Sequence, residues 1–223
     1  MITDRLIDRV IELQNPSVVG LDPNPAFIPR HIMKKHTKKH TNTQAAIALA
    51  VYEFNVSLMD ALAGIVPAVK PQIAFYEQFG AEGISCYIET IKYAKQLGYF
   101  VIGDIKRGDI ASTAKAYSDA HIGRVIFYGE EKPVYDADFI TLNPYLGYDS
   151  VKPFLDNARE YDKGLFILVK TSNPGAGDIQ DVDTINGKVY EIVADKIPGM
   201  AQGSKMVRTV YIFETPMLCP PSR

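Results

Sequence analysis

The chain has 223 residues, of which 47% are hydrophobic and 22% are charged, and its formal net charge is -2. That length can bury a sizeable core, and the near-neutral balance gives no electrostatic case for nucleic acid or an anionic membrane as a partner. Two cysteines, Cys86 and Cys219, are too few for a disulfide framework, so we expect a reducing cytoplasm. Residues 1–14 lack the apolar core of a signal peptide, and polar residues interrupt the longest apolar stretch, 45–69, which argues against a membrane span.

Short apolar runs alternate along the chain with longer stretches of helical periodicity. The runs are rich in Val, Ile and Phe and do not alternate with polar residues, which predicts strands buried on both faces at residues 17–21, 64–69, 99–105, 138–142 and 164–169. Helices are predicted between and after them, at residues 47–62, 84–97, 110–122, 150–161 and 182–196. A sixth strand is possible at residues 206–213. Five β-then-α units predict a parallel α/β fold, either an open doubly wound sheet or a (β/α)8 barrel.

Polar residues follow the carboxyl ends of several different strands, which favours the barrel. Asp22, Lys70, Asp104, Asn143 and Lys170 each stand at or just after such an end. Barrel enzymes assemble their sites from several strand ends, whereas open sheets concentrate ligands at one switch point behind a Gly-rich fingerprint, which is missing after the first strand. We therefore predict a single (β/α)8 barrel domain over residues 1–223.

The basic segment "MKKHTKKHT", residues 33–41, lies between the first strand and its helix. It could grip a phosphate, but a solvated surface insertion is the favoured interpretation. His36 and His40 have the spacing of a helical metal pair, yet no carboxylate or cysteine stands beside them, so no metal is expected.

The stretch "YFVIGDIKRGDIASTAKAY" places Asp104, Lys106 and Asp109 within six positions after an apolar run. Asp104 and Lys106 are two residues apart on a strand and share one face, and Asp109 follows where a helix should begin. Alone, these residues could form a core ion pair and a helix N-cap. Lys70, on a neighbouring strand about 4.8 Å away, extends them into an alternating series of acids and bases. Such a series predicts a preorganised electrostatic site, and with no metal-ligand set or nucleotide motif beside it we expect a reaction without a cofactor.

Five strand-end segments together resemble one enzyme family. "IGDIKRGDIASTA" resembles the D-x-K-x-x-D-I-x-x-T signature of the orotidine 5'-phosphate decarboxylases, and "VGLDPN", "VKPQIAFYE", "TLNPYLG" and "VKTSNPGAGD" resemble the other strand ends of its bacterial long-form subgroup. The resemblance covers residues 1–197 in order. It implies a homodimeric (β/α)8 barrel that converts orotidine 5'-monophosphate to uridine 5'-monophosphate in pyrimidine synthesis without a cofactor.

The resemblance also implies roles for individual residues. Lys106 resembles the proton donor to pyrimidine C6, Asp104 the carboxylate that faces the leaving carboxylate, and Lys70 the lysine that orders the network and touches the ribose. Asp22 resembles the ribose-binding aspartate and Ser172 a contact to the pyrimidine edge.

A second group of residues resembles those that reach into the partner subunit's site: Asp109, Ile110 and Thr113. This assignment replaces the N-cap interpretation of Asp109 by a role in a shared active site.

Several alternatives stay open. Lys170 is either a Schiff-base lysine or, preferably, a structural paired one, and residues 173–178 form either a phosphate cradle or a plain turn. Related barrel enzymes use a similar D-x-K-x-x-D with Mg²⁺ for sugar-phosphate lyase or epimerase chemistry.

The resemblance fades at about residue 198, so residues 198–223 are expected to form an atypical tail, and strands seven and eight of the barrel are not evident. "IPGMAQG" echoes a phosphate-binding loop with Gln202 as the contact, although a chance match is preferred. A shifted reading frame or a truncation would explain the change, and the product would then be an inactive decarboxylase-like protein.

Overall fold

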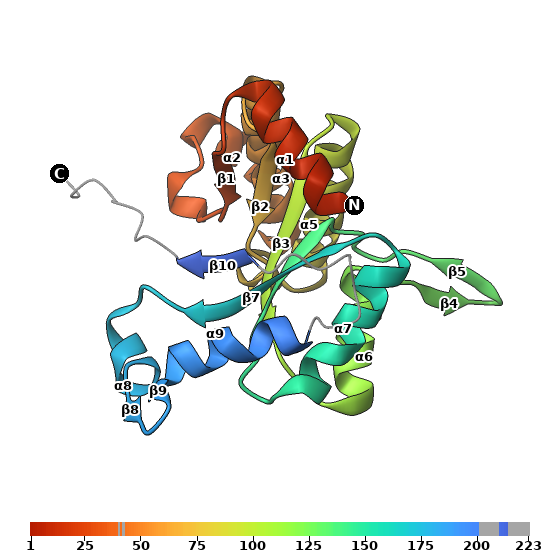
Figure 1. Ribbon diagram of the computed structural model, residues 1–223. Coiled ribbons are helices and arrows are strands. Elements are labelled where there is room, and N and C mark those ends of the chain that lie inside the picture. The colour runs from red at the N-terminus through yellow and green to blue at the C-terminus, as the bar shows by residue number, and fades with distance from the viewer. Residues whose placement is uncertain (40, 42, 201–209, 214–223) are drawn as a thin grey trace.

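The computed structural model describes residues 1–39, 41, 43–200 and 210–213. Its centre is a parallel sheet in the order β1-β2-β3-β6-β7-β10 (Figure 1). The strands are β1 (Val18–Leu21), β2 (Ala68–Pro71), β3 (Phe100–Arg107), β6 (Phe139–Leu142), β7 (Gly164–Lys170) and β10 (Val210–Phe213). The five predicted strands are confirmed, and the possible sixth occurs as β10, paired with β7. The remainder of the tail, Gln202 included, lies outside the described residues.

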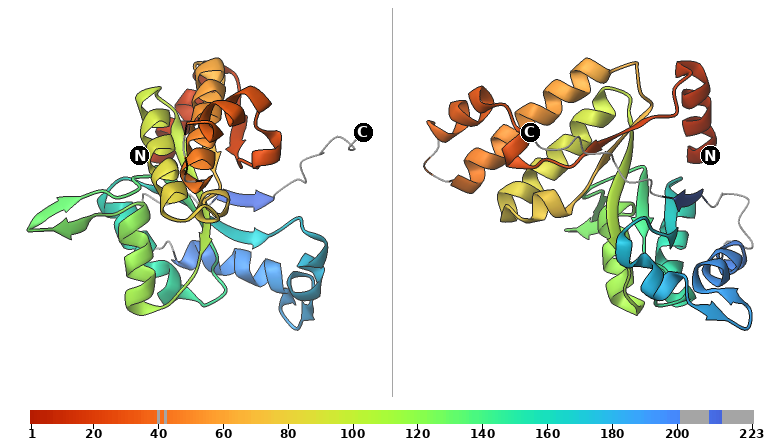
Figure 2. Two further views of the ribbon diagram at one scale, coloured as in Figure 1. Left: turned by 180° about the vertical axis from the view of Figure 1, so that it is seen from behind. Right: turned by 90° about the vertical axis from the view of Figure 1, so that its left-hand side faces the viewer.

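Helices connect successive strands and lie outside the sheet, as the two views of Figure 2 show. The predicted ones are α3 (Thr43–Leu62), α5 (Gly80–Gln96), α6 (Ala111–His121), α7 (Tyr148–Glu160) and α9 (Val189–Met200). The sheet itself curls: in Figure 1, β1 to β3 run up and down the view while β7 and β10 run across it. A curled parallel sheet with helices outside it is the β/α-barrel architecture. Over the described residues the sheet is open between β1 and β10.

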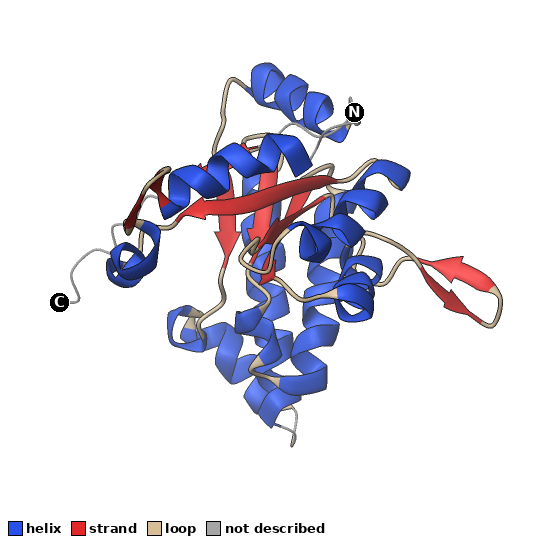
Figure 3. Cartoon of the chain, turned by 60° about the horizontal axis from the view of Figure 1, so that its bottom comes forward, coloured by secondary structure: helices blue, strands red, loops and turns tan. Residues whose placement is uncertain are grey.

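The sequence analysis missed several smaller elements. They are α1 (Ile2–Leu13), α2 (Arg30–Thr37), α4 (Ala74–Glu77), α8 (Gly177–Gln180), the 3-10 turns Pro25–Phe27 and Pro174–Ala176, and the hairpins β4 (Val125–Phe127)–β5 (Glu130–Lys132) and β8 (Asp183–Thr184)–β9 (Gly187–Lys188). The β4–β5 hairpin projects from the body of the molecule (Figure 3). Helix α1 packs Ile2 against Ala68, Ile102 and Phe139, so it covers the end of the sheet opposite to the polar strand ends.

The buried faces explain why the strands read as uninterrupted apolar runs. All four residues of β6 are buried, and the core continues outward to α3 and α5. By length and composition alone α3 could cross a membrane. A share of 33% of that apolar stretch is buried, and its residues Ala50, Val51 and Met59 pack in the core.

Candidate active site

Asp104 is the centre of the charge network at the carboxyl end of β3. Its Oδ2 accepts a hydrogen bond from Lys70 Nζ at 2.8 Å, and its Oδ1 accepts one from Lys106 Nζ at 2.7 Å. Lys70 comes from the end of the neighbouring strand β2. Asp104 is only 2% exposed, whereas the lysine side chains are 31% and 33% exposed. The carboxylate is therefore enclosed by the protein, while both lysine side chains remain partly accessible to solvent.

The pKa of Asp104 is lowered. Burial on its own would raise it, because a charged carboxylate is poorly solvated inside a protein, but the hydrogen bonds from Lys106 and Lys70 outweigh burial. The carboxylate therefore stays ionised at neutral pH, and its charge holds the two lysines in fixed positions.

The sequence analysis missed one member of this network, Thr141. Its hydroxyl donates to Asp104 Oδ1 at 2.8 Å and accepts the backbone N–H groups of Ile105 and Lys106 at 2.9 and 3.0 Å. Thr141 lies on β6 and is 1% exposed. A threonine one residue before the end of a buried strand is a weak signal, since β-branched residues are common in strands.

Asp22 and Ser172 lie at the same edge of the sheet as the network. Asp22 directly follows β1 and is half-buried, and Ser172 is exposed on the turn after β7. Gln180 fixes the backbone beside Ser172: its Oε1 accepts the Thr171 amide at 2.8 Å, and its Nε2 donates to the Thr171 hydroxyl at 2.8 Å.

The structure separates Asp109 from the network. Among contacts between described residues, its carboxylate accepts the N–H of Ile110 at 2.7 Å and is not ion-paired with Lys106. The N-cap interpretation of Asp109 is wrong: α6 begins at Ala111, its N-cap is Ile110, and no side chain caps it. Ile110 is 52% exposed and Thr113 is also exposed, so this turn faces solvent.

Lys170 has a structural environment. It forms an ion pair with Asp181, and its Nζ lies 4.8 Å from the centre of the Tyr190 ring. Residues 173–178, the candidate phosphate cradle, fold as the 3-10 turn Pro174–Ala176 and the start of α8.

Residues 33–39 of the basic segment form the end of α2 and the turn that follows it, and His40 lies outside the described residues. The expectation that His36 has no carboxylate beside it is wrong, because Glu53 of α3 lies 2.6 Å from His36 Nε2 and 2.7 Å from Lys35 Nζ. Glu53 is distant in sequence, which is why the segment alone did not show it. Within the described residues, no group of three or more His, Cys, Asp or Glu side chains is placed to hold a metal ion.

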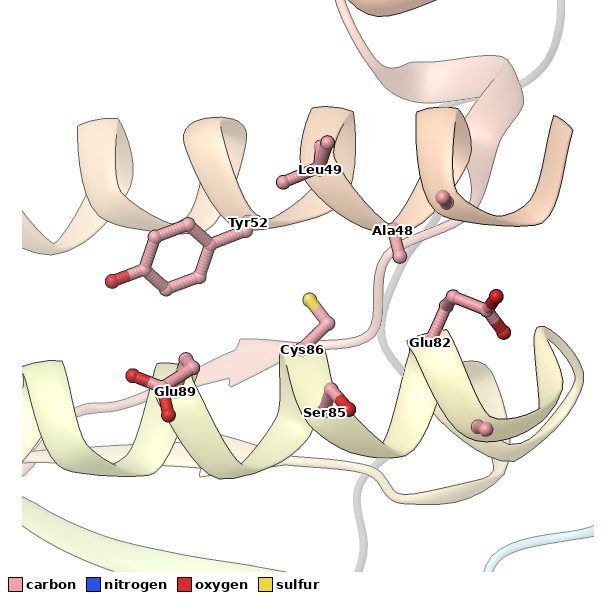
Figure 4. Close-up of a pocket in the computed structure, with 9 residues that line it drawn as sticks. Ala48, Leu49, Tyr52, Glu82, Ser85, Cys86 and Glu89 are labelled. Carbon is pink, nitrogen blue, oxygen red and sulfur yellow. The ribbon is translucent and has the colours of Figure 1, made fainter. Parts of the chain in front are cut away.

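A separate hollow of about 580 Å³ lies between α3 and α5. Figure 4 shows it between the two helices, with Tyr52 and Leu49 on one side and Cys86 and Glu82 on the other. It is mostly apolar and lies on the outer, helical layer rather than at the strand ends. The charge network, not this hollow, is the candidate active site.

The fold and the site together define a class of protein, the β/α barrels with charged groups at the carboxyl ends of their strands. Comparison with known proteins agrees with this class. Residues 18–205 match the model of the orotidine 5'-phosphate decarboxylase / HUMPS family. The chain is 40% identical over 203 residues to the orotidine 5'-phosphate decarboxylase of Clostridium acetobutylicum, covering 91% of this chain and 65% of that protein. It is 42% identical over 199 residues to the enzyme of Petrotoga mobilis, covering 88% and 63%.

The structure of Leishmania donovani OMP decarboxylase aligns with a TM-score of 0.70 at 32% identity, covering 94% of this chain and 70% of that one. This chain therefore belongs to the orotidine 5'-phosphate decarboxylase / HUMPS family. The predicted family and barrel fold are confirmed. The chain spans about 65% of the length of the Clostridium relative, and the family match ends at residue 205, inside the segment predicted to be an atypical tail.

Proposed function

We propose that this chain carries the catalytic network for decarboxylation of orotidine 5'-monophosphate to uridine 5'-monophosphate. The observation that carries the proposal is the buried Asp104 carboxylate held between Lys70 and Lys106 at strand ends. Support comes from the family match over residues 18–205, since the Clostridium and Petrotoga relatives bear the name of this activity.

The chemistry needs a fixed cation beside the reacting carbon. When the C6–carboxylate bond breaks, CO2 leaves and its electron pair stays on C6, which has no adjacent electron sink. The Lys106 ammonium stabilises that charge as it develops and then transfers its proton to C6. Solvent reprotonates the amine, so the cycle closes without a cofactor. Asp104 holds the ammonium in place and faces the substrate carboxylate, while Lys70 balances the second carboxylate oxygen.

A magnesium-dependent lyase or epimerase fits this site less well. Three donors already occupy the oxygens of Asp104: Lys70 on Oδ2, and Lys106 and Thr141 on Oδ1. Divalent cations bind best to carboxylate oxygens that are free to coordinate them, and two ammonium groups would repel the ion. We therefore favour cofactor-independent decarboxylation.

Asp22 and Ser172 are proposed substrate contacts, to the ribose and the pyrimidine edge. Both stand after strands of the sheet that carries the network. Gln180 supports the assignment of Ser172, because its two hydrogen bonds to Thr171 stabilise the residue that directly precedes Ser172.

We further propose a homodimer in which Asp109, Ile110 and Thr113 complete the partner's site. Their placement on an exposed turn outside their own charge network supports this. Mixing inactive Lys106→Ala and Asp109→Ala protomers should restore up to about a quarter of the wild-type activity, because one mixed site would be intact in half the dimers. Absence of recovery on mixing, with both variants folded, would contradict shared sites. The cytoplasm is the proposed location.

Turnover of orotidine 5'-monophosphate, followed by loss of substrate absorbance, tests the proposed activity. We expect turnover by the purified chain in the presence of EDTA. Loss of activity on chelation would support the metal-dependent alternative instead. Absence of turnover together with weak or undetectable binding of uridine 5'-monophosphate by calorimetry would support an inactive decarboxylase-like protein that cannot grip the phosphate, whereas tight binding would contradict that alternative.

A further inference from the structure

The backbone of β3 departs from the regular sheet where the network begins. On one side of the irregularity Gly103 pairs with Ile140, and on the other Arg107 pairs with Leu142. Between these pairs β3 contains three residues, 104–106, whereas β6 contains only Thr141. The extra residues form a bulge, a feature that redirects side chains and is frequent beside active sites.

The bulge also places Lys106 in an unusual conformation. Its φ is 45°, in the left-handed region that residues with a side chain rarely adopt. Such a conformation persists only where surrounding contacts impose it. The amides of Ile105 and Lys106 donate to the Thr141 hydroxyl.

One hydroxyl therefore makes three contacts at this point. It accepts both bulge amides, and it donates its own proton to Asp104 Oδ1, the same oxygen that accepts the Lys106 ammonium. Because Thr141 is 1% exposed, water cannot readily replace it. The Thr141 hydroxyl thus hydrogen-bonds both the backbone of Lys106 and the carboxylate that holds the Lys106 side chain.

We propose that Thr141 is a positioning residue, whose hydroxyl fixes the β3 bulge so that Lys106 and Asp104 keep the relative placement that proton transfer to the substrate requires. The proposal rests on the proposed function for its catalytic consequence, but its structural content can be measured without turnover.

Thr141→Val removes the hydroxyl at nearly constant volume, and Thr141→Ser keeps it. With Thr141→Val we expect faster hydrogen exchange at the amides of Ile105 and Lys106. We also expect a rise in the pKa of the Asp104 carboxyl group, which carbon-13 NMR can follow once the Asp104→Asn variant has identified its signal. In an active chain kcat should fall by roughly 10- to 100-fold, the scale of a misplacement near 1 Å. Thr141→Ser should retain all three properties.

Thr90 provides a matched control, because it is fully buried on α5 and its hydroxyl accepts the Asn55 amide. Thr90→Val should lower stability without changing the Asp104 titration or the exchange of the two bulge amides. If Thr141→Val does not fold, Thr141→Cys replaces the hydroxyl by a weak donor and acceptor, and should shift the same readouts in the same direction.

Three results would overturn the proposal. The first is that amide exchange and the Asp104 titration stay unchanged in folded Thr141→Val. The second is that Thr141→Ser changes these properties as much as Thr141→Val does. The third applies where only the cysteine variant folds, and is that its exchange and titration equal those of Thr141→Ser. A chain that turns over substrate while these readouts stay unchanged would refute the role of Thr141 and leave the proposed function standing. A chain that is inactive but shows the predicted NMR changes would support the role of Thr141 and count against the proposed function.

Discussion

Replacing Asp104 by asparagine tests whether the network depends on charge rather than on shape. The side chain keeps its size, but its amide is neutral and only one of its two polar atoms can accept a hydrogen bond. At least one of the contacts from Lys70 and Lys106, at 2.8 and 2.7 Å, then loses its acceptor, and the other loses its charge assistance. Charged hydrogen bonds contribute ~1.5–3 kcal/mol, against about 1 kcal/mol for neutral ones.

Solvent reduces that value here, because both lysine side chains are about one-third exposed. We expect Asp104→Asn to lower the free energy of unfolding by about 2 kcal/mol at pH 7. Urea unfolding followed by far-UV circular dichroism measures it. The matched control is Asp8→Asn, at an exposed aspartate of α1, which should change stability by less than about 0.5 kcal/mol.

The pH dependence has a defined sign. Because the pKa of Asp104 is lower in the folded protein than in the unfolded chain, its stabilisation is complete above the ordinary value of about 3.9. It is lost as the pH falls through the lowered folded value. The difference between wild type and Asp104→Asn should therefore shrink in acid. A difference that is near zero at pH 7, or that is the same in acid as at pH 7, would refute this account of the network.

Three other predictions concern the scaffold. Lys163→Met should destabilise the fold by about 2 kcal/mol, because Lys163 is 8% exposed and its Nζ is 2.8 Å from Asp136 Oδ1. Urea unfolding measures this change, and an unchanged urea midpoint would contradict it. Gly164→Ala should cost about 1–3 kcal/mol in the same assay, because a Cβ there would lie 2.1 Å from Phe139 Cδ1, and wild-type stability would refute the close approach. Burial raises the pKa of Cys86 to about 12, so its thiol should resist alkylation at pH 8 until the protein unfolds; rapid labelling of the folded protein, mapped by mass spectrometry, would contradict its burial.

The sequence predicted the strand-end charges because local patterns determine them. An apolar run followed by Asp104 and Lys106 specifies a buried strand with charges at its end, and the structure places both residues there. The predicted approach of Lys70 is also observed, since adjacent parallel strands bring their carboxyl ends together.

Contacts between residues far apart in sequence were not predictable in this way. Thr141 joins the network across 37 positions, and Glu53 meets His36 across 17. Asp109 could be interpreted as a cap because aspartate is a frequent N-cap, but the turn after β3 delays the helix until Ala111. Helix starts and bulges depend on tertiary packing, which one strand's pattern does not contain.

The most direct test of the proposed chemistry is the rate of orotidine 5'-monophosphate turnover by Lys106→Ala. Removing the ammonium deletes both the electrostatic stabilisation of C6 and the proton donor, so kcat should fall by at least about 10³-fold. The control is Lys115→Ala, an exposed lysine paired with Asp119 on α6, which should keep the wild-type rate. A folded Lys106→Ala variant that turns over substrate at the wild-type rate would contradict the account.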